Sequence, residues 1–101
     1  MDKYKIVFTK RTYFMLENHL RFLKQVNKDA AKRLKIKIME SIRSLKKMPE
    51  RHPFVEDEYI LQNKYRKLFV ENWYLILYQV KNDTVYVEYI LDGRQDYQWL
   101  I

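Results

Sequence analysis

Cysteine is absent from this chain of 101 residues, which also holds one glycine and two prolines. The lack of cysteine excludes disulfides, thiolate zinc sites and cysteine nucleophiles. One glycine is too few for a P-loop or a dinucleotide-binding fingerprint, which both need several. No apolar run approaches the roughly 20 residues of a membrane span, and the first residues lack the apolar core of a signal peptide. We therefore expect one cytoplasmic domain over residues 1–101, without membrane contact, metal or small-molecule cofactor.

Positive charge is concentrated in one segment. The formal net charge of the chain is +7, and residues 28–47 hold eight lysines and arginines against two acidic residues. A field this dense attracts polyanions, either nucleic acid or an acidic protein. The alternative is a solvated helix face that lysine keeps soluble, and charge alone does not decide between them.

The first half of the chain predicts a strand and two helices. Residues 4–8 read as a short strand, after which Thr9 can cap a helix that ends near Gln25. Asn27 can cap a second helix, which Pro49 stops. The connection is so short that the helices must form an antiparallel hairpin. Their apolar stripes are predicted at Tyr13, Leu16, Leu20 and Leu23, and at Ala31, Leu34, Ile38, Ile42 and Leu45.

The second half predicts a loop followed by three strands. Residues 48–63 read as the loop, and the strands cover 65–70, 74–80 and 84–91, joined by connections short enough for hairpins. The expected fold is therefore α+β: a small antiparallel sheet, in the order strand-helix-helix-strand-strand-strand, with the helical hairpin packed on one face. Because residues 74–80 are apolar on both faces, the second face needs a cover. That cover is either a partner or the chain itself, for example Trp99, Leu100 and Ile101.

The three runs 65–70, 74–80 and 90–97 resemble the RelE/ParE superfamily of bacterial toxins. The helical hairpin before them, which carries Ala30-Ala31, Ser44-Leu45 and Pro49, is similar too, so that the resemblance covers essentially the whole chain. It implies the toxin of a type II toxin–antitoxin module that arrests bacterial growth and is held inactive by a cognate antitoxin. Toxins of the RelE branch are ribosome-dependent mRNA endonucleases (mRNA interferases, which inhibit translation), whereas those of the ParE branch are non-catalytic inhibitors of DNA gyrase. A basic nucleic-acid-binding domain without toxin activity remains the alternative.

The branches differ in the chemistry they require. Cleavage of RNA by its own 2′-hydroxyl needs cations around the phosphate, a proton acceptor and a proton donor. The resemblance implies Arg66, Arg94 and Tyr97 as the candidate catalytic residues. Two further basic positions of the nuclease branch fall on Leu68 and Leu75 in this chain. Lys64 or Lys67 can compensate from nearby for the missing cations, but these leucines, together with a long first helix, favour the gyrase-inhibitor reading.

Candidate residues for binding RNA or a protein target lie around the first strand of the meander. They are Lys64, Tyr65 and Lys67, with His52 in the preceding loop. Each also has a structural interpretation, since tyrosine in strands usually packs and a lone histidine is usually structural. His19, in the middle of the first helix, is expected at the boundary of the core, and the acidic residues 56–58 are expected to be solvated.

Overall fold

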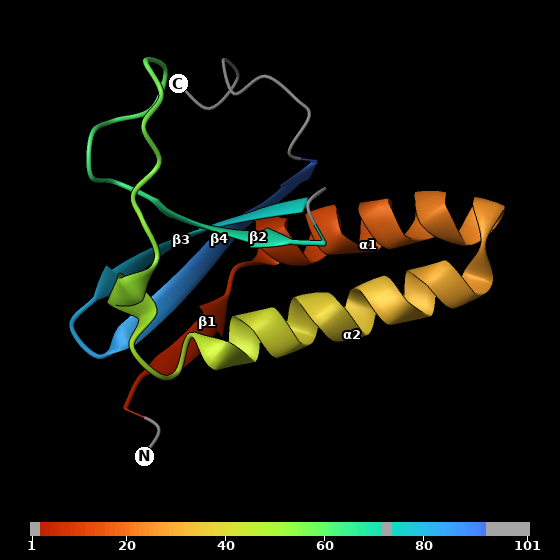
Figure 1. The fold of residues 1–101 in the computed structure, drawn as a ribbon, viewed down its shortest axis with the longest axis horizontal. Coiled ribbons are helices and arrows are strands. Elements are labelled where there is room, and N and C mark those ends of the chain that lie inside the picture. Colours follow the sequence, from red (N-terminus) through yellow and green to blue (C-terminus); the bar gives the residue numbers. More distant parts are fainter. Residues whose placement is uncertain (1–2, 72–73, 93–101) are drawn as a thin grey trace.

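Residues 3–71 and 74–92 are described by the computed structural model (Figure 1). The strand-helix-helix-strand-strand-strand order is confirmed, with one 3₁₀ turn added. The elements are β1 (Lys5–Phe8), α1 (Lys10–Val26), α2 (Lys28–Ser44), the 3₁₀ helix η1 (Pro49–Arg51), β2 (Arg66–Val70), β3 (Tyr74–Lys81) and β4 (Thr84–Asp92).

The sheet has the strand order β1-β4-β3-β2. Strands β2, β3 and β4 form the predicted antiparallel meander. β1, however, pairs in parallel with β4, with Lys5 opposite Thr84 and Phe8 opposite Val87, so the sheet is mixed. The hairpin connections fix the neighbours within the meander but leave both its edges open. The helical hairpin carries the chain from β1 across to β2, which places β1 on the other edge.

Two side-chain caps set the boundaries of the helices. Thr9 Oγ1 accepts a hydrogen bond from the Thr12 backbone N–H, and Asn27 Oδ1 accepts one from the Ala30 N–H. Asn27 also ends α1, since its backbone N–H donates to the Leu23 carbonyl. Because one extended residue ends the first helix and caps the second, the helices fold back as the predicted antiparallel hairpin, and Figure 1 shows them side by side.

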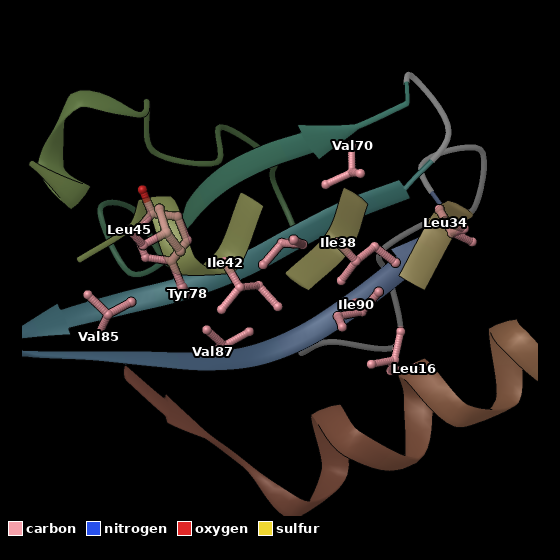
Figure 2. Packing of buried hydrophobic residues seen from close by; sticks show 11 residues of the cluster. Leu16, Leu34, Ile38, Ile42, Leu45, Val70, Tyr78, Val85, Val87 and Ile90 are labelled. Carbon is pink, nitrogen blue, oxygen red and sulfur yellow. The ribbon is translucent and has the colours of Figure 1, made fainter. Parts of the chain in front are cut away.

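The main core lies between the helical hairpin and one face of the sheet (Figure 2). The predicted stripe of α2 is buried, and all of it except Ala31 belongs to this core, where Leu16 joins it from α1. Tyr13, also predicted on the α1 stripe, is instead 55% exposed and contacts the Phe8 ring edge-on. Thr12 is fully buried in its place. The residues of this main core are Leu16, Leu34, Ile38, Ile42, Leu45, Val70, Ile76, Tyr78, Val85, Val87 and Ile90.

A second, smaller core covers part of the opposite face. Val55, Ile60 and Tyr65 come from the segment between η1 and β2. Val55 and Ile60 lie in the stretch predicted to be a plain loop, and Tyr65 was predicted to begin the strand that in fact starts at Arg66. They pack against the side chains of β3 and β4 that point away from α2, namely Leu75, Leu77, Tyr89 and Leu91, and Met15 of α1 packs against the same cluster. The cover of this face is therefore supplied by the chain itself. Trp99, Leu100 and Ile101, the predicted cover, lie outside the described residues.

A β-bulge in β4 rotates the pattern of buried residues. Leu77 pairs with Tyr89 while Tyr78 pairs with Val87, so Glu88 is an extra residue on β4. Val87 before the bulge points to the helices, whereas Tyr89 after it points to the second core. Bulges of this kind redirect side chains and often occur beside functional surfaces.

Candidate functional site

Arg66, the first residue of β2, ties the preceding segment to the sheet. Its Nη1 donates hydrogen bonds to the carbonyl oxygens of His52 at 2.8 Å and Glu50 at 3.0 Å. The guanidinium carbon lies 4.0 Å from the centre of the Phe54 ring, a cation–π stack. An isolated backbone bridge also joins Phe54 to Arg66. The guanidinium is thus held in one orientation.

A hollow of about 270 Å³, which we call the notch, opens beside Arg66. It forms because β3 is longer than β2: Arg66 pairs with Tyr78, so the last residues of β3 extend past the start of β2. Three cationic side chains and one carboxylate line it, which favours an anionic ligand. The lining residues are Glu50, Phe54, Asn63, Lys64, Arg66, Gln79, Val80 and Lys81.

Of the predicted binding residues, Lys64 lies with Arg66 at the notch, whereas Tyr65 and Lys67 turn to the second face of the sheet. Lys64 Nζ nevertheless lies 5.2 Å from the centre of the Tyr65 ring. Tyr65 points into the second core, where its ring lies edge-on to Tyr89 at 5.7 Å. Burial, reinforced by the negative charge of Glu88, raises the pKa of Tyr65 to about 12. Lys67 pairs with Leu77, so its side chain lies on the same face of the sheet as Tyr65 and the second core. Tyr65 is therefore a packing residue.

His52 follows η1 and lies between that turn and the sheet. Its ring is edge-on to the Tyr78 ring, with 6.3 Å between the ring centres. Its Nε2 is buried and has no hydrogen-bond partner among the described residues. Burial lowers the pKa of His52, and the charges of Arg51 and Arg66 lower it further. The neutral imidazole fills space here and does not line the notch.

The two leucines at the basic positions of the nuclease branch are packing residues. Leu75 is 1% exposed within the second core, and Leu68 packs from the other face against the main core. Arg94 and Tyr97, the other predicted catalytic residues, lie outside the described residues. Arg66 is therefore the one predicted catalytic residue that the structure places.

The sequence interpretation missed a set of α1 side chains that bind the edge of β4. Thr12 Oγ1 donates to the Val87 carbonyl at 2.8 Å, and Arg11 Nε donates to the Glu88 carbonyl at 3.4 Å. His19 Nε2 lies 2.8 Å from the Ile90 carbonyl oxygen, a contact that requires the proton on Nε2. β1 ends opposite Val87, so these side chains bond to β4 carbonyls at and beyond that end. The spacing of seven residues between Thr12 and His19, one helix face, was the available signal.

Arg11 also closes a small polar cluster at the bulge. It forms an ion pair with Glu88 at 3.6 Å and lies 4.0 Å from the centre of the Tyr89 ring. Gln79 Nε2 donates to the other carboxylate oxygen of Glu88. The Glu88 carboxylate is thus held by two donors, which makes it part of the scaffold.

The model of one protein family matches the chain over residues 6–97: the ParE toxin of the type II toxin–antitoxin system parDE. The chain belongs to the ParE toxin family. A solved structure, described as the chromosomal ParDE TA system from P. aeruginosa, has the same fold with a TM-score of 0.74. It is 15% identical, and the match covers 91% of this chain and 98% of that one. No curated protein matches the sequence.

Two further observations on this ParE-family chain concern ligands and membranes. Among residues 3–71 and 74–92, no group of three or more histidine, aspartate or glutamate side chains is placed to hold a metal ion. In the same part of the chain, no helix is long and apolar enough to cross a membrane.

Proposed function

We propose that this ParE-family toxin arrests bacterial growth by binding DNA gyrase without catalysis, and that a cognate antitoxin neutralises it. The observation that supports this choice is that Leu75 is buried and Leu68 half-buried in core clusters, at two positions where the nuclease branch requires cations. The resemblance implied Arg66 as catalytic, but its Nη1 already donates two hydrogen bonds to backbone carbonyls.

The energetic consequence of the leucines is large. Loss of one charge-assisted contact to a developing phosphorane lowers a rate by about a hundredfold, or roughly 3 kcal/mol, by analogy with oxyanion donors. Leu68 and Leu75 together remove two such contacts. Both side chains are apolar and pack against core clusters, so neither position supplies a cation to the surface. A binding function needs no such contacts.

An apolar groove supports the antitoxin partner. It has a volume of about 560 Å³ and lies between the tip of the helical hairpin and the start of β3. Ile36 on its wall is 56% exposed, and Phe22 and Val26 on the last turns of α1 are more exposed still. Apolar surface of this kind marks a protein-binding site. The groove is lined by Leu23, Ala30, Arg33, Leu34, Ile36, Lys37, Glu71 and Tyr74, so two cations on its rim suit an acidic partner.

The test of the target uses the purified chain in two parallel assays. We expect it to inhibit supercoiling by DNA gyrase and to leave mRNA on programmed ribosomes intact. Cleavage of ribosome-bound mRNA without an effect on gyrase would contradict the proposal and favour the RelE-like endonuclease.

The antitoxin is tested by co-expression with the neighbouring open reading frame. We expect a complex whose melting temperature exceeds that of the toxin, because a ligand of the native state stabilises it by mass action. Ile36→Glu should weaken the complex, since it adds a negative charge to an apolar wall that faces an acidic partner. Leu61→Glu is the matched control, because Leu61 is 71% exposed and lies away from the groove, in the segment between η1 and β2. This variant should leave binding unchanged. Unchanged binding by Ile36→Glu would place the antitoxin elsewhere, and an equal loss with both variants would mean that the added charge, not the groove, weakens the complex.

A further inference from the structure

The second face of the sheet is covered only in part, and the register identifies the uncovered part. Ile6 and Phe8 of β1 pack against the main core, so their neighbours Lys5 and Val7 point to the opposite face. Two rows cross three strands on that face. They are Lys5, Thr84 and Lys81, and next to them Val7, Tyr86 and Gln79. All six side chains are exposed or half-buried, and we call them the open strip.

The open strip continues into the notch, because Gln79 and Lys81 belong to both. Arg66 stands at the far wall with its guanidinium fixed through Nη1 and stacked on Phe54. A fixed planar fork loses little freedom when it binds an oxyanion, which favours Arg at such sites. Lys64 stands on the same wall. The result is a path that begins at the cations Lys64 and Arg66, passes the ring of Tyr86 and ends at the cation Lys5.

Nearby carboxylates have partners of their own. Glu50 accepts a hydrogen bond from the Tyr4 hydroxyl, and Asp83 accepts one from Thr84 Oγ1. Glu88 is held by Arg11 and by Gln79. Of these acids, Glu88 is paired with a cation, whereas the hydroxyl donors to Glu50 and Asp83 are neutral and leave the charge of each carboxylate in place. The strip and the notch still hold four cations, Lys5, Lys64, Arg66 and Lys81, against these two acids.

We propose that the open strip and the notch bind a single-stranded nucleic acid, with one base stacked on Tyr86 and the adjacent phosphate in the notch. Tyr86 is paired directly with Gln79, so its backbone lies one strand spacing, about 4.8 Å, from a residue that lines the notch. Lys81 Nζ lies 5.9 Å from the centre of the Tyr86 ring, on the phosphate side. A basic groove combined with a stacking ring is the composition of single-strand sites.

The strip favours an unpaired strand over the two nearest alternatives. A duplex hides the faces of its bases, so Tyr86 would have no stacking partner. An acidic peptide would use the cations but not the ring. The open strip lies on the sheet face opposite α2, and the notch lies at the adjoining edge of β3, which Arg66 reaches from the main-core side because it pairs with Tyr78. The site is separate from the apolar groove, so the inference goes beyond the proposed binding of gyrase and the antitoxin.

The experiment measures the binding of a fluorescein-labelled 12-nucleotide DNA strand to the purified chain by anisotropy at several salt concentrations. Tyr86→Ala should weaken binding about tenfold, whereas Tyr86→Phe, which keeps the ring, should bind as the wild type does. Lys64→Ala and Lys81→Ala should each lower the slope of log K against log salt by about 0.7. Lys24→Ala and Lys35→Ala on the helical hairpin, and Tyr13→Ala on α1, are the matched controls and should have little effect.

Three results would overturn the inference. If Lys24→Ala and Lys35→Ala weaken binding as much as the strip variants do, the strand is attracted by the helices. If Tyr86→Ala has no effect while inorganic phosphate displaces the strand in a manner that depends on Lys64, the notch is a phosphate site without a base. If a poly-glutamate peptide competes as well as unlabelled DNA, the surface recognises acidic protein.

Discussion

The two faces of the sheet are covered in different ways. On the first face, α2 packs against the sheet with side chains at helical spacing, and Leu16 joins them from α1 (Figure 2). On the second face an irregular segment covers one part and leaves the open strip uncovered. The start of that segment is anchored on the first face, where Arg66 donates to the Glu50 and His52 carbonyls and the Tyr78 hydroxyl donates to the Pro49 carbonyl. A face covered by helices serves stability, whereas a face covered in part leaves surface for binding.

The largest effect is expected from a charge placed inside the second core. Leu75→Arg should cost about 4 kcal/mol or more, or prevent folding, because an unpaired cation would be buried at a position that is 1% exposed. Phe69→Arg is the control, since Phe69 pairs with Leu75 on the same face but is 52% exposed. Urea denaturation of both variants measures the difference. A stable Leu75→Arg protein that cuts mRNA would show that this position serves the nuclease chemistry.

The helix-covered face could be predicted from the sequence because its signals are local. The caps Thr9 and Asn27 and the α2 stripe each depend on residues within one or two helical turns, and all three are confirmed. The second-face cover could not be predicted, since Val55 and Ile60 occur in a stretch without periodicity. Their burial depends on long-range contacts with β3 and β4. The parallel pairing of β1 with β4 joins residues about 80 positions apart and left no local signal either.

The candidate site was predicted in the same uneven way. Arg66 and Lys64 do meet in the notch, because neighbouring residues at the start of a strand stay close in space. Lys81 and Gln79 were missed, since only the register of β3 against β2 reveals that the last residues of β3 extend past its partner. The role of Tyr65 depends on the face of the sheet to which its side chain points. A shift of one residue in the register of β2 would have placed it on the other face.

Truncation of one residue in each core compares the two faces directly. Ile38→Ala in the main core should cost about 3 kcal/mol, since Ile38 is fully buried between α2 and the sheet. Val55→Ala in the second core should cost about 1–2 kcal/mol, because it removes less volume from a cover that can readjust. Urea midpoints give both values. Hydrogen exchange should show local opening around residues 52–65 for Val55→Ala alone, and global opening in both would mean that the two cores are equally cooperative.

Removal of the Arg66 side chain should loosen the segment between η1 and β2, which it holds by hydrogen bonds to the Glu50 and His52 carbonyls. Arg66→Ala removes two hydrogen bonds from a charged donor and the stack on Phe54, at a cost of about 2 kcal/mol. Arg43→Ala, at an exposed position near the end of α2, should change stability by less than about 0.5 kcal/mol. Chemical denaturation measures both. If Arg66→Ala is as stable as Arg43→Ala and still abolishes growth arrest, Arg66 acts on the target and its structural role is minor.

The smallest effect is a pH dependence carried by His52. Burial and two neighbouring arginines lower the pKa of His52 in the folded protein, so the unfolded chain takes up the proton first as the pH falls. Its contribution to stability is therefore complete above the ordinary histidine pKa of 6.5 and is lost progressively below it. The wild type should lose more stability between pH 7.5 and pH 5.5 than His52→Gln does, as measured by urea denaturation at both values. The pH-dependent difference between the wild type and His52→Gln should be smaller than the stability lost in Arg66→Ala, because His52 is only half-buried. Equal losses in the wild type and His52→Gln would place the acid-sensitive group elsewhere and would leave the packing of the segment between η1 and β2 independent of His52 protonation.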